Sequence, residues 1–574
     1  MIVAALCELY DRLGEMMPKR HWGAEKVAGE LRIDKDGNLV GVYSYADEPK
    51  GQKILQVPEH DSRTSAVKAF FMCDKAAYLF GRDAKHGQEM FEASRDLHNR
   101  VLGGVEDDGA LAVLRFYEKD ENRQRHLDSL EALDGKLLVF RGTWDNRLIH
   151  EREKIVAAWM DFKQERLKGT KVQCAVTGEQ DMAANLFPQV SGVQGGQSSG
   201  VSLISYNDEC YCSYGRTSKD KALNASIGER AAFKAGAALK YLFSDRAHRV
   251  SYCGTHVLFW TESCQAEDDE FLRLALGLDI ASMAGEDEVL LERLRATLGD
   301  IRKGKKPVGV DESARYHVLG VTPNAARLAV RFYDRGTLGR LEENLKSYLD
   351  DIDMVGEQDM NRSIGYYLER VAPLGDKKNV PNTLTASATE AVLRGKPLPN
   401  SLFTAAIGRM RADKGKERGV TAYRAAIMRA FLRRKARLGN DYELERSLTV
   451  ALNEENRNQG YLLGRLFAAL EKAQGDAIGS KLNASIKDRY IGAASSTPAK
   501  VFPQLLKGAQ HHVAKTEYGA TNDRRIEEII ALMDAQTAFP ATLDYDDQGQ
   551  FFIGYYQQKE AIYTKRSGKE ASNE

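Results

Sequence analysis

Residues 31–45 read LRIDKDGNLVGVYSY, with apolar and polar residues alternating on both sides of Asp36-Gly37. A period of two places alternate side chains on one face of an extended strand. An Asp-Gly pair readily takes the positive φ angles of a tight hairpin turn. The stretch therefore predicts a β-hairpin near the start of the chain.

Short apolar runs with strand character follow this hairpin, and helical patterns separate them. Residues 1–13 and 91–102 each place their apolar side chains on one helical face. The expected strands are residues 69–73, 77–80, 137–140, 172–176, 201–206, 257–260 and 328–332. We therefore expect an α+β body with antiparallel strands over residues 1–395.

The pattern changes near Pro397–Pro399, beyond which almost the whole sequence is of helical type. Spacings of three and four residues place one set of apolar side chains on a single face: Leu463, Leu466, Phe467, Leu470, Ala473 and Ala477. We expect an all-α helical bundle over residues 396–562. Residues 563–574 are polar and are expected to form a flexible tail.

The length and composition predict a multidomain protein that does not insert into a membrane. The chain has 574 residues, and no stretch approaches the roughly 20 apolar residues that cross a bilayer. The first helical pattern carries Glu8 and Asp11 where a signal peptide needs an apolar core. Seven cysteines, an odd number at irregular spacing, fit a reducing compartment. We expect a cytoplasmic protein.

Charge is unevenly distributed although the net charge is zero. Residues 409–437 contain eleven Lys or Arg and two acids, whereas residues 262–300 are rich in Asp and Glu. A basic helical segment suits strong, sequence-independent contact with phosphates. A solvated helix face or an acidic protein partner is the alternative. The candidate contacts are Arg409, Arg411, Arg424, Arg429, Arg433 and Arg434.

Two other segments carry groups suited to a DNA groove. Asp74 and Lys75 are expected to form a turn between two strands, narrow enough to probe a groove. Arg63, Thr64 and Lys68 precede that turn. A second surface is a Gly/Ser/Gln loop that holds Gln194, Gln197, Ser198 and Ser199. For Asp74 and Lys75 the alternative is an ordinary charged turn. For the Gly/Ser/Gln loop the alternative is a solvated connection between strands.

Enzymatic motifs are incomplete. Gly196–Gly200 matches a nucleophile elbow around Ser198, but the loop precedes a strand, whereas an elbow serine follows a strand and begins a helix. His60-Asp61 resembles part of a metal-dependent nuclease site that needs further ligands. The alternative function is a hydrolase or nuclease at these residues. We expect no catalytic residue, resident metal or cofactor.

Several strings in one order resemble the large subunit of the type I-C CRISPR Cascade, a Csd-type CRISPR-associated family. They span nearly the whole chain: residues 63–66, 73–81, 174–179, 194–200, 205–207, 213–215, 319–327, 460–467, 486–490 and 554–557.

The resemblance implies a subunit without catalytic residues that recognises a protospacer-adjacent motif in double-stranded DNA. It also implies help with strand opening, binding of the displaced strand and a platform for a helicase-nuclease. The implied partners are guide RNA, a guide-capping subunit, repeated backbone subunits and small subunits translated internally from the C-terminal region. Met428 and residues 448–452 are both compatible with that internal start. Base pairing by the guide then reads most of the target sequence.

Overall fold

The computed structural model describes residues 1–46, 51–60, 67–124, 130, 133–166, 169–206, 208–276, 288–305, 309–356, 363–413, 419–479 and 484–570. These residues form two compact units. Unit 1 comprises Met1–Pro188 and Ser205–Leu239, and unit 2 comprises Gln189–Ile204 and Lys240–Glu574. Both units combine sheet and helices, so the expected α+β class is confirmed.

Unit 1 is built on a mixed sheet with the strand order β2-β1-β5-β4, and β3 also pairs with β1. The predicted hairpin is confirmed, because β1 and β2 pair antiparallel around Gly37, whose φ is +80°. Strands β1 and β5 pair in parallel, which the expectation of antiparallel strands did not include. The strands are β1 (Trp22–Ile33), β2 (Leu39–Ser44), β3 (Lys53–Pro58), β4 (Cys73–Lys75) and β5 (Leu137–Gly142).

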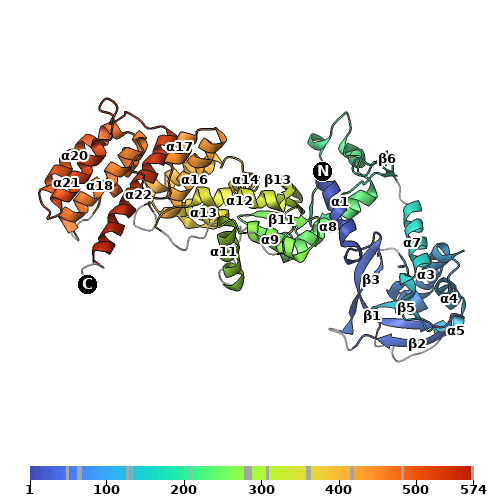
Figure 1. Ribbon diagram of the computed structural model, residues 1–574. Helices are drawn as coiled ribbons and strands as arrows, with labels where there is room; N and C mark the ends of the chain where they lie inside the picture. The colour runs from blue at the N-terminus through green and yellow to red at the C-terminus, as the bar shows by residue number, and fades with distance from the viewer. Residues whose placement is uncertain are drawn as a thin grey trace. The chain divides into compact units, whose positions relative to one another are not determined.

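Helices lie against this sheet (Figure 1). They bury an aromatic core that includes Phe71, Phe116 and Phe140. The expected strand over residues 77–80 is wrong, since that apolar run begins a short helix instead. The helices are α1 (Ile2–Leu13), α2 (Ala76–Phe80), α3 (Gly87–Leu102), α4 (Asp108–Glu118), α5 (Asp120–Gln124) and α7 (Glu153–Glu165). A small antiparallel pair, β6 (Lys171–Gln173) and β7 (Gln180–Met182), follows them, and α8 (Glu229–Ser244) spans the division between the units.

Unit 2 begins with a second sheet, of strand order β10-β11-β12-β13-β9-β8. Its long neighbours β12 and β13 pair antiparallel, whereas β9 lies parallel to β13. The strands are β8 (Gln189–Val190), β9 (Val201–Ser202), β10 (Arg249–Tyr252), β11 (Thr255–Thr261), β12 (Arg315–Asn324) and β13 (Arg327–Thr337).

The rest of unit 2 is helical. Among the described residues, α9 (Ala266–Leu276) and α11 (Glu288–Arg302) lie between β11 and β12. The all-helical part begins at α12 (Leu338–Ile352), earlier than the expected start at residue 396. It continues through α13 (Ile364–Val371), α14 (Asn382–Arg394), α15 (Asn400–Ala412), α16 (Ala422–Leu438), α17 (Tyr442–Ser447), α18 (Gln459–Ile478), α19 (Ile486–Ala494), α20 (Pro498–Val513), α21 (Gly519–Ile530) and α22 (Tyr545–Glu570).

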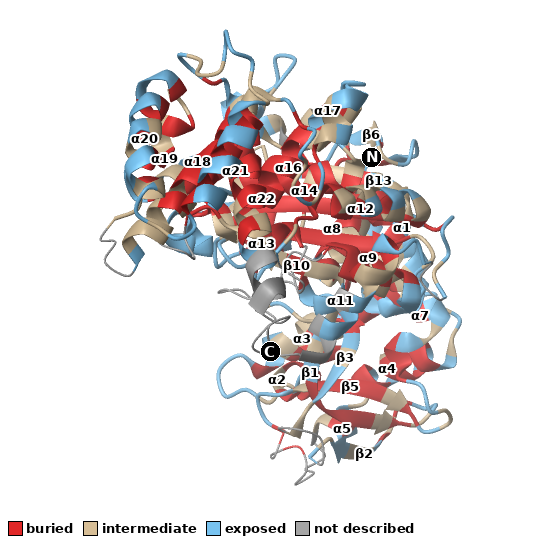
Figure 2. Ribbon diagram, turned by 60° about the vertical axis from the view of Figure 1, so that its left-hand side comes forward, coloured by how far each residue is buried: buried red, intermediate tan, exposed pale blue. Residues whose placement is uncertain are grey.

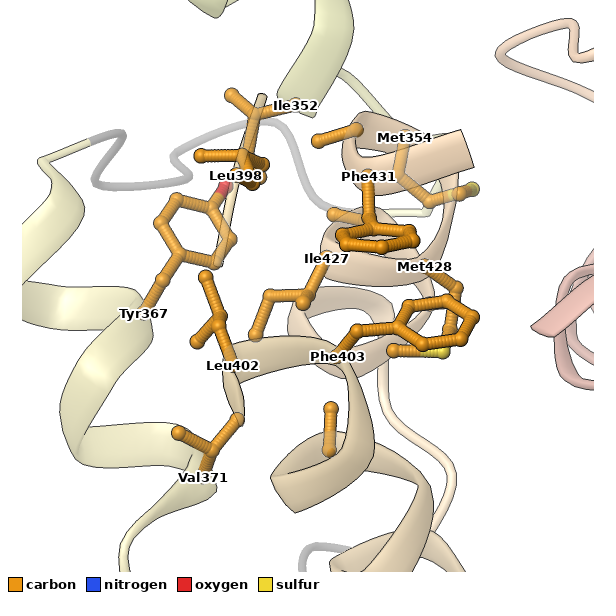
Figure 3. Packing of buried hydrophobic residues seen from close by; sticks show 14 of the residues in the cluster. Ile352, Met354, Tyr367, Val371, Leu398, Leu402, Phe403, Ile427, Met428 and Phe431 are labelled. Atoms are coloured by element: carbon orange, nitrogen blue, oxygen red, sulfur yellow. The ribbon is translucent and has the colours of Figure 1, made fainter. Parts of the chain in front are cut away.

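One hydrophobic core runs across the expected boundary at residue 395. Figure 3 shows Leu402 and Phe403 of α15 packed with Ile427 and Phe431 of α16, close to Tyr367 of α13. Figure 2 shows α16, α18 and α22 buried along most of their lengths. Residues 1–395 and 396–562 are therefore not separate compact bodies, because the helices on both sides share this core.

The expected flexible tail, residues 563–574, continues α22 as far as Glu570, and residues 571–574 lie outside the described part. None of the described helices combines the length and the apolar character that crossing a membrane requires.

Candidate nucleic-acid interface

The predicted Gly/Ser/Gln surface is an exposed loop between β8 and β9. We refer to residues 191–200 as the glutamine loop. Gln194, Gln197, Ser198 and Ser199 are all exposed. The strands on either side are two residues long, so their pairing alone cannot define the shape of a ten-residue loop. Contacts with the neighbouring strands determine the shape of the loop instead.

Backbone hydrogen bonds hold the glutamine loop against the turn between β12 and β13. The amide of Gln197 donates to the carbonyl of Ala325 at 3.1 Å, and the amide of Ser202 donates to the carbonyl of Ala326 at 2.9 Å. These bonds use main-chain atoms, so the amide side chain of Gln197 does not serve as the anchor. The loop is therefore a positioned surface that offers its side chains to solvent.

A buried histidine fixes the first part of the same loop. His256 lies on β11 with Nε2 2.9 Å from the carbonyl oxygen of Gln194 and Nδ1 2.7 Å from Oγ of Ser251. A carbonyl only accepts, so Nε2 donates to Gln194, and Nδ1 accepts from the hydroxyl of Ser251. Burial lowers the pKa of His256, so the ring is neutral at neutral pH and keeps this arrangement.

Two glycines of the glutamine loop have steric reasons to be glycine. Gly200 has a φ of +112°, which side chains disfavour. A Cβ atom on Gly196 would lie 2.6 Å from Cγ1 of Val201. The close packing of the loop on its own hairpin therefore depends on the absence of these side chains.

Three arginines lie on β13, the first of them beside the glutamine loop, and sequence reasoning did not identify them as candidates. Arg327 is paired in register with Ser202 at the end of the loop. Arg331 and Arg335 are exposed farther along the strand, and Nε of Arg331 donates to Oγ1 of Thr322 at 3.1 Å. Only Arg331 falls within the expected strand over residues 328–332, so no expected element brought these arginines together. They add exposed positive charge to the strand whose first residue pairs with the end of the glutamine loop.

The expected turn at Asp74 and Lys75 is wrong. Cys73–Lys75 is β4, which pairs with β5 and leads directly into α2. Asp74 is fully buried, and its carboxylate accepts from the amides of Phe70 and Lys75 at 2.8 and 2.7 Å. Asp74 therefore orders its own segment and offers nothing to a groove.

Lys75 and Lys68 are the exposed members of this segment. Lys75 stands at the N-terminal end of α2, whereas Lys68 lines a cavity between α3 and α7. Arg63 and Thr64, the other predicted contacts, lie outside the described residues.

Most of the basic helix α16 faces the protein interior. Arg424, Arg429 and Arg434 are 6 %, 3 % and 1 % exposed. Arg429 donates through Nη1 to the carbonyls of Asp350 and Asp351, both at 2.8 Å, and burial lowers its pKa to about 10. Arg434 donates through Nε to the carboxylate of Asp351 at 3.1 Å. The guanidinium groups of Arg429 and Arg434 are enclosed and are not placed to contact a displaced strand in this folded chain, whereas Arg424 contributes to the wall of a cavity at the start of α16.

The other predicted arginines also make internal contacts. Arg433 donates to the carbonyl of Asp350 at 3.0 Å and remains partly exposed. Arg411 donates to Oγ of Ser495 at 3.1 Å and to Oε1 of Gln548 at 2.7 Å, which ties α15 to the last helices. Arg409 pairs with Asp413 on its own helix at 3.4 Å. These side chains stabilise the helical part of unit 2. Only their partly exposed atoms remain available to a nucleic acid.

A tyrosine-rich cavity of about 720 Å³ lies at the N-terminal end of α16. We call it the tyrosine cavity; its wall includes Arg370, Tyr423, Tyr556, Lys559 and Tyr563. The guanidinium of Arg370 lies over the ring of Tyr423, 5.4 Å from its centroid. Aromatic rings beside cations are the usual platform for single-stranded nucleic acid. Sequence reasoning missed this site because its residues come from three separate helices.

Among the described residues, no recognisable catalytic site supports either enzymatic alternative, the hydrolase at Ser198 or the nuclease at His60-Asp61. Ser198 is exposed in a loop that leads into β9, so the strand-to-helix turn of a nucleophile elbow is not formed. His60 stacks on Phe70 with ring centroids 4.0 Å apart, and Asp61 lies outside the described residues. Among the residues that are described, no group of three or more His, Cys, Asp or Glu is arranged to hold a metal ion.

Comparison with known proteins gives one match of full length. A family model described as CRISPR-associated protein (Cas_Csd1) matches residues 6–563. No curated protein matches the chain.

Proposed function

The chain belongs to the Cas_Csd1 family of CRISPR-associated proteins and is a Cascade subunit; from that premise we propose that it is the large, non-catalytic subunit of a type I-C surveillance complex. In this proposal it recognises the protospacer-adjacent motif in double-stranded DNA and helps to open the strands. It works with guide RNA, a guide-capping subunit and repeated backbone subunits, and it offers a docking platform to the helicase-nuclease.

The glutamine loop is the observation that supports motif recognition best. A glutamine amide both donates and accepts, so Gln194 and Gln197 can pair with base edges that offer both kinds of group. The anchors on Ala325 and His256 hold the loop backbone, which lowers the entropy lost on binding. The β13 arginines are suited to phosphate contacts that position the duplex without reading it. Lys75 remains a second candidate, in unit 1.

Competition binding tests this assignment. The assembled complex is bound to a motif-matched duplex and challenged with a motif-mutated duplex. Gln197→Ala is expected to reduce discrimination by about 1 to 3 kcal/mol. Gln510→Ala, an exposed glutamine on α20, is the matched control and is expected to leave discrimination unchanged. Unchanged discrimination in both Gln197→Ala and Lys75→Ala would remove both assignments.

We assign the displaced strand to the tyrosine cavity, whose wall includes Arg424, and not to Arg429 and Arg434 of α16. Lys559 and Arg370 supply positive charge there, and Tyr563 supplies a ring that is 51 % exposed. Tyr563→Ala is expected to increase the reactivity of displaced-strand thymines to permanganate in the DNA-bound complex. Tyr545→Ala, on the same helix and 61 % exposed, is the control. Equal reactivity in both variants would contradict the assignment.

The helix boundaries favour one of the two internal starts of a small subunit. Met428 is fully buried in the middle of α16, so a chain that starts there would begin inside a helix. Residues 448–452 lie between α17 and α18, and a chain from there keeps α18–α22 whole. We therefore propose a start near residues 448–452. With Met428→Leu, the purified complex is expected to retain the small subunit. Loss of the small subunit in this variant would support the Met428 start.

Membership of the complex and the absence of catalysis are tested together. Co-expression with neighbouring genes is expected to recover the chain with guide RNA and repeated small subunits. The purified complex without its helicase-nuclease is expected to leave DNA and ester substrates intact. A lone protein without RNA, or an activity that Ser198→Ala or His60→Ala abolishes, would return the hydrolase or nuclease alternative.

A further inference from the structure

A cavity of about 600 Å³ lies in unit 1 between α3 and α7. We call it the α3–α7 cavity. Its wall comes from the start of β1, the segment before β4 and the facing sides of the two helices, and it includes Lys68, Phe70, Arg100, Trp159, Phe162 and Arg166. The volume falls in the range of sites that take a small molecule or one residue of a polymer. The glutamine loop belongs to unit 2, so this cavity is a separate feature.

Aromatic rings form a continuous stack on one side of the α3–α7 cavity. Trp159 stacks on Phe71 with centroids 4.9 Å apart and planes inclined by 11°. Trp159 also stacks on Phe162, with centroids 5.7 Å apart and planes inclined by 22°. Phe162 and Phe70 are only partly buried, so their rings reach the cavity surface. A flat aromatic ligand could extend this stack.

Positive charge surrounds the same rings. Nζ of Lys163 lies 5.0 Å from the centroid of the Trp159 ring, and the guanidinium of Arg166 lies 5.0 Å from that of Phe162. Lys68 and Arg100 are exposed at the rim. Of the two carboxylates in the wall, Glu59 lies 3.8 Å from Lys163 and Asp96 lies 3.3 Å from Arg95. The cavity therefore favours a ligand with both a flat ring and negative charge.

One wall residue has an unused polar atom. Nε2 of His21 is buried and has no hydrogen-bond partner among the described residues, while Nδ1 lies 3.3 Å from Glu59. His21 also has a φ of +59°, which is unfavourable for a residue with a side chain. Its carbonyl accepts from Nε1 of Trp159 at 2.9 Å, so the strained residue is fixed to the aromatic stack. A ligand in the cavity could satisfy the free nitrogen.

We propose that the α3–α7 cavity receives one unpaired nucleotide of a nucleic-acid strand, with its base on the aromatic stack and its phosphates on the cationic rim. In this arrangement His21 Nε2 bonds to the edge of the base. The inference rests on the proposed function, because an RNA-guided complex holds single-stranded RNA and also creates single-stranded DNA. The shared chemistry of these two strands is an unstacked base next to a phosphate.

Ultraviolet cross-linking of the assembled complex tests the proposal. The complex is irradiated with guide RNA alone and again with a target duplex, and its peptides are analysed by mass spectrometry. We expect a nucleotide adduct on a peptide that contains residues 67–71 or 155–166. A ribonucleotide mass identifies the guide as the source, and a deoxyribonucleotide mass identifies the target.

Variants at the aromatic stack give the same test a quantitative form. Phe162→Ala with Arg166→Ala is expected to abolish the adduct and to weaken binding of the adducted strand about tenfold. Phe162→Trp retains a ring and is expected to keep both. Lys154→Ala removes an exposed charge from the same helix outside the cavity and is expected to change neither. Thermal unfolding of each complex confirms that the fold is intact.

Three results would overturn the proposal: no adduct on these peptides, an adduct unchanged in the Phe162/Arg166 double variant, or a cross-linked peptide of another subunit in place of a nucleotide. Motif discrimination by the same preparations separates this failure from failure of the proposed function. If discrimination is intact, only the α3–α7 cavity assignment is lost.

Discussion

Helix α16 and strand β13 both carry a series of arginines, and the fold uses the two series in opposite ways. On α16, Arg429 and Arg434 are enclosed and donate to carbonyls and to the buried carboxylate of Asp351. On β13, Arg331 and Arg335 are exposed, four and eight residues along the strand from Arg327, which pairs with Ser202 at the end of the glutamine loop. The denser and more conspicuous basic segment makes internal contacts that stabilise the protein, whereas the sparser one remains exposed.

The difference comes from the partners that each series finds in the folded chain. An arginine is buried only where acceptors replace the water that it loses. Asp351 and the C-terminal end of α12 supply those acceptors to α16. Charge density along a sequence therefore does not by itself identify a nucleic-acid surface.

The largest expected effect tests the structural role of the α16 series. Asp351 is fully buried and accepts from Arg434 at 3.1 Å and from Arg437 at 2.6 Å. Asp351→Ala leaves these guanidinium groups uncompensated and is expected to lower the free energy of unfolding by about 3 to 5 kcal/mol. Urea unfolding followed by circular dichroism measures the loss. Glu343→Ala, exposed on the same helix, serves as the control, and equal stability of the two variants would contradict the structural role.

Two buried histidines of unit 1 are neutral, in contrast to the buried charged arginines of α16. A titration of protein stability against pH tests this contrast. Burial lowers the pKa of His98 and of His150 to about 4 each, below the usual 6.5. The unfolded chain therefore binds more protons between pH 6.5 and 4, so stability is lost as pH falls through that window. Each histidine contributes a loss of up to roughly 3 kcal/mol by pH 4.

Tryptophan fluorescence follows that loss, because Trp22, Trp144 and Trp159 all belong to unit 1. His86 is exposed, and His86→Gln is expected to leave the acid transition unchanged. A flat stability profile between pH 6.5 and 4 would show that His98 and His150 do not remain neutral in the fold.

The smallest expected effect tests the β13 series. Arg331→Ala and Arg335→Ala each remove one proposed phosphate contact, so affinity should fall similarly for matched and mutated duplexes. The slope of log K against log salt should fall in magnitude by about 1 for each variant. Arg446→Ala, an exposed arginine on α17, should leave the slope unchanged. A loss confined to matched DNA would instead assign the β13 arginines to base reading.

Local patterns predicted the parts of the fold that local sequence controls. The hairpin at Asp36-Gly37 and the helix from Leu463 to Ala477 are both present. Residues 77–80 were misassigned because a short apolar run has no period that separates strand from helix. The boundary at residue 395 was also misplaced, since a change of pattern along the chain does not show which helices share a core.

Sequence reasoning predicted the candidate site only for residues whose exposure follows from the local amino-acid composition. Val193 is the one apolar side chain of the glutamine loop and is buried, whereas its glutamines and the serines at 198 and 199 are exposed as expected. Its anchors on Ala325 and His256 are distant in sequence and could not be foreseen. The burial of Arg434 depends on Asp351, 83 residues earlier, which is a long-range pairing of the same kind.

Selection from a pool of duplexes with a randomised adjacent motif tests the central claim most directly. The assembled complex is compared with Gln194→Ala plus Gln197→Ala and with Arg331→Ala plus Arg335→Ala. The account predicts that the glutamine variant enriches a broader set of motifs, whereas the arginine variant enriches the original motif with lower yield. An unchanged motif in the glutamine variant would show that the glutamine loop does not read the DNA.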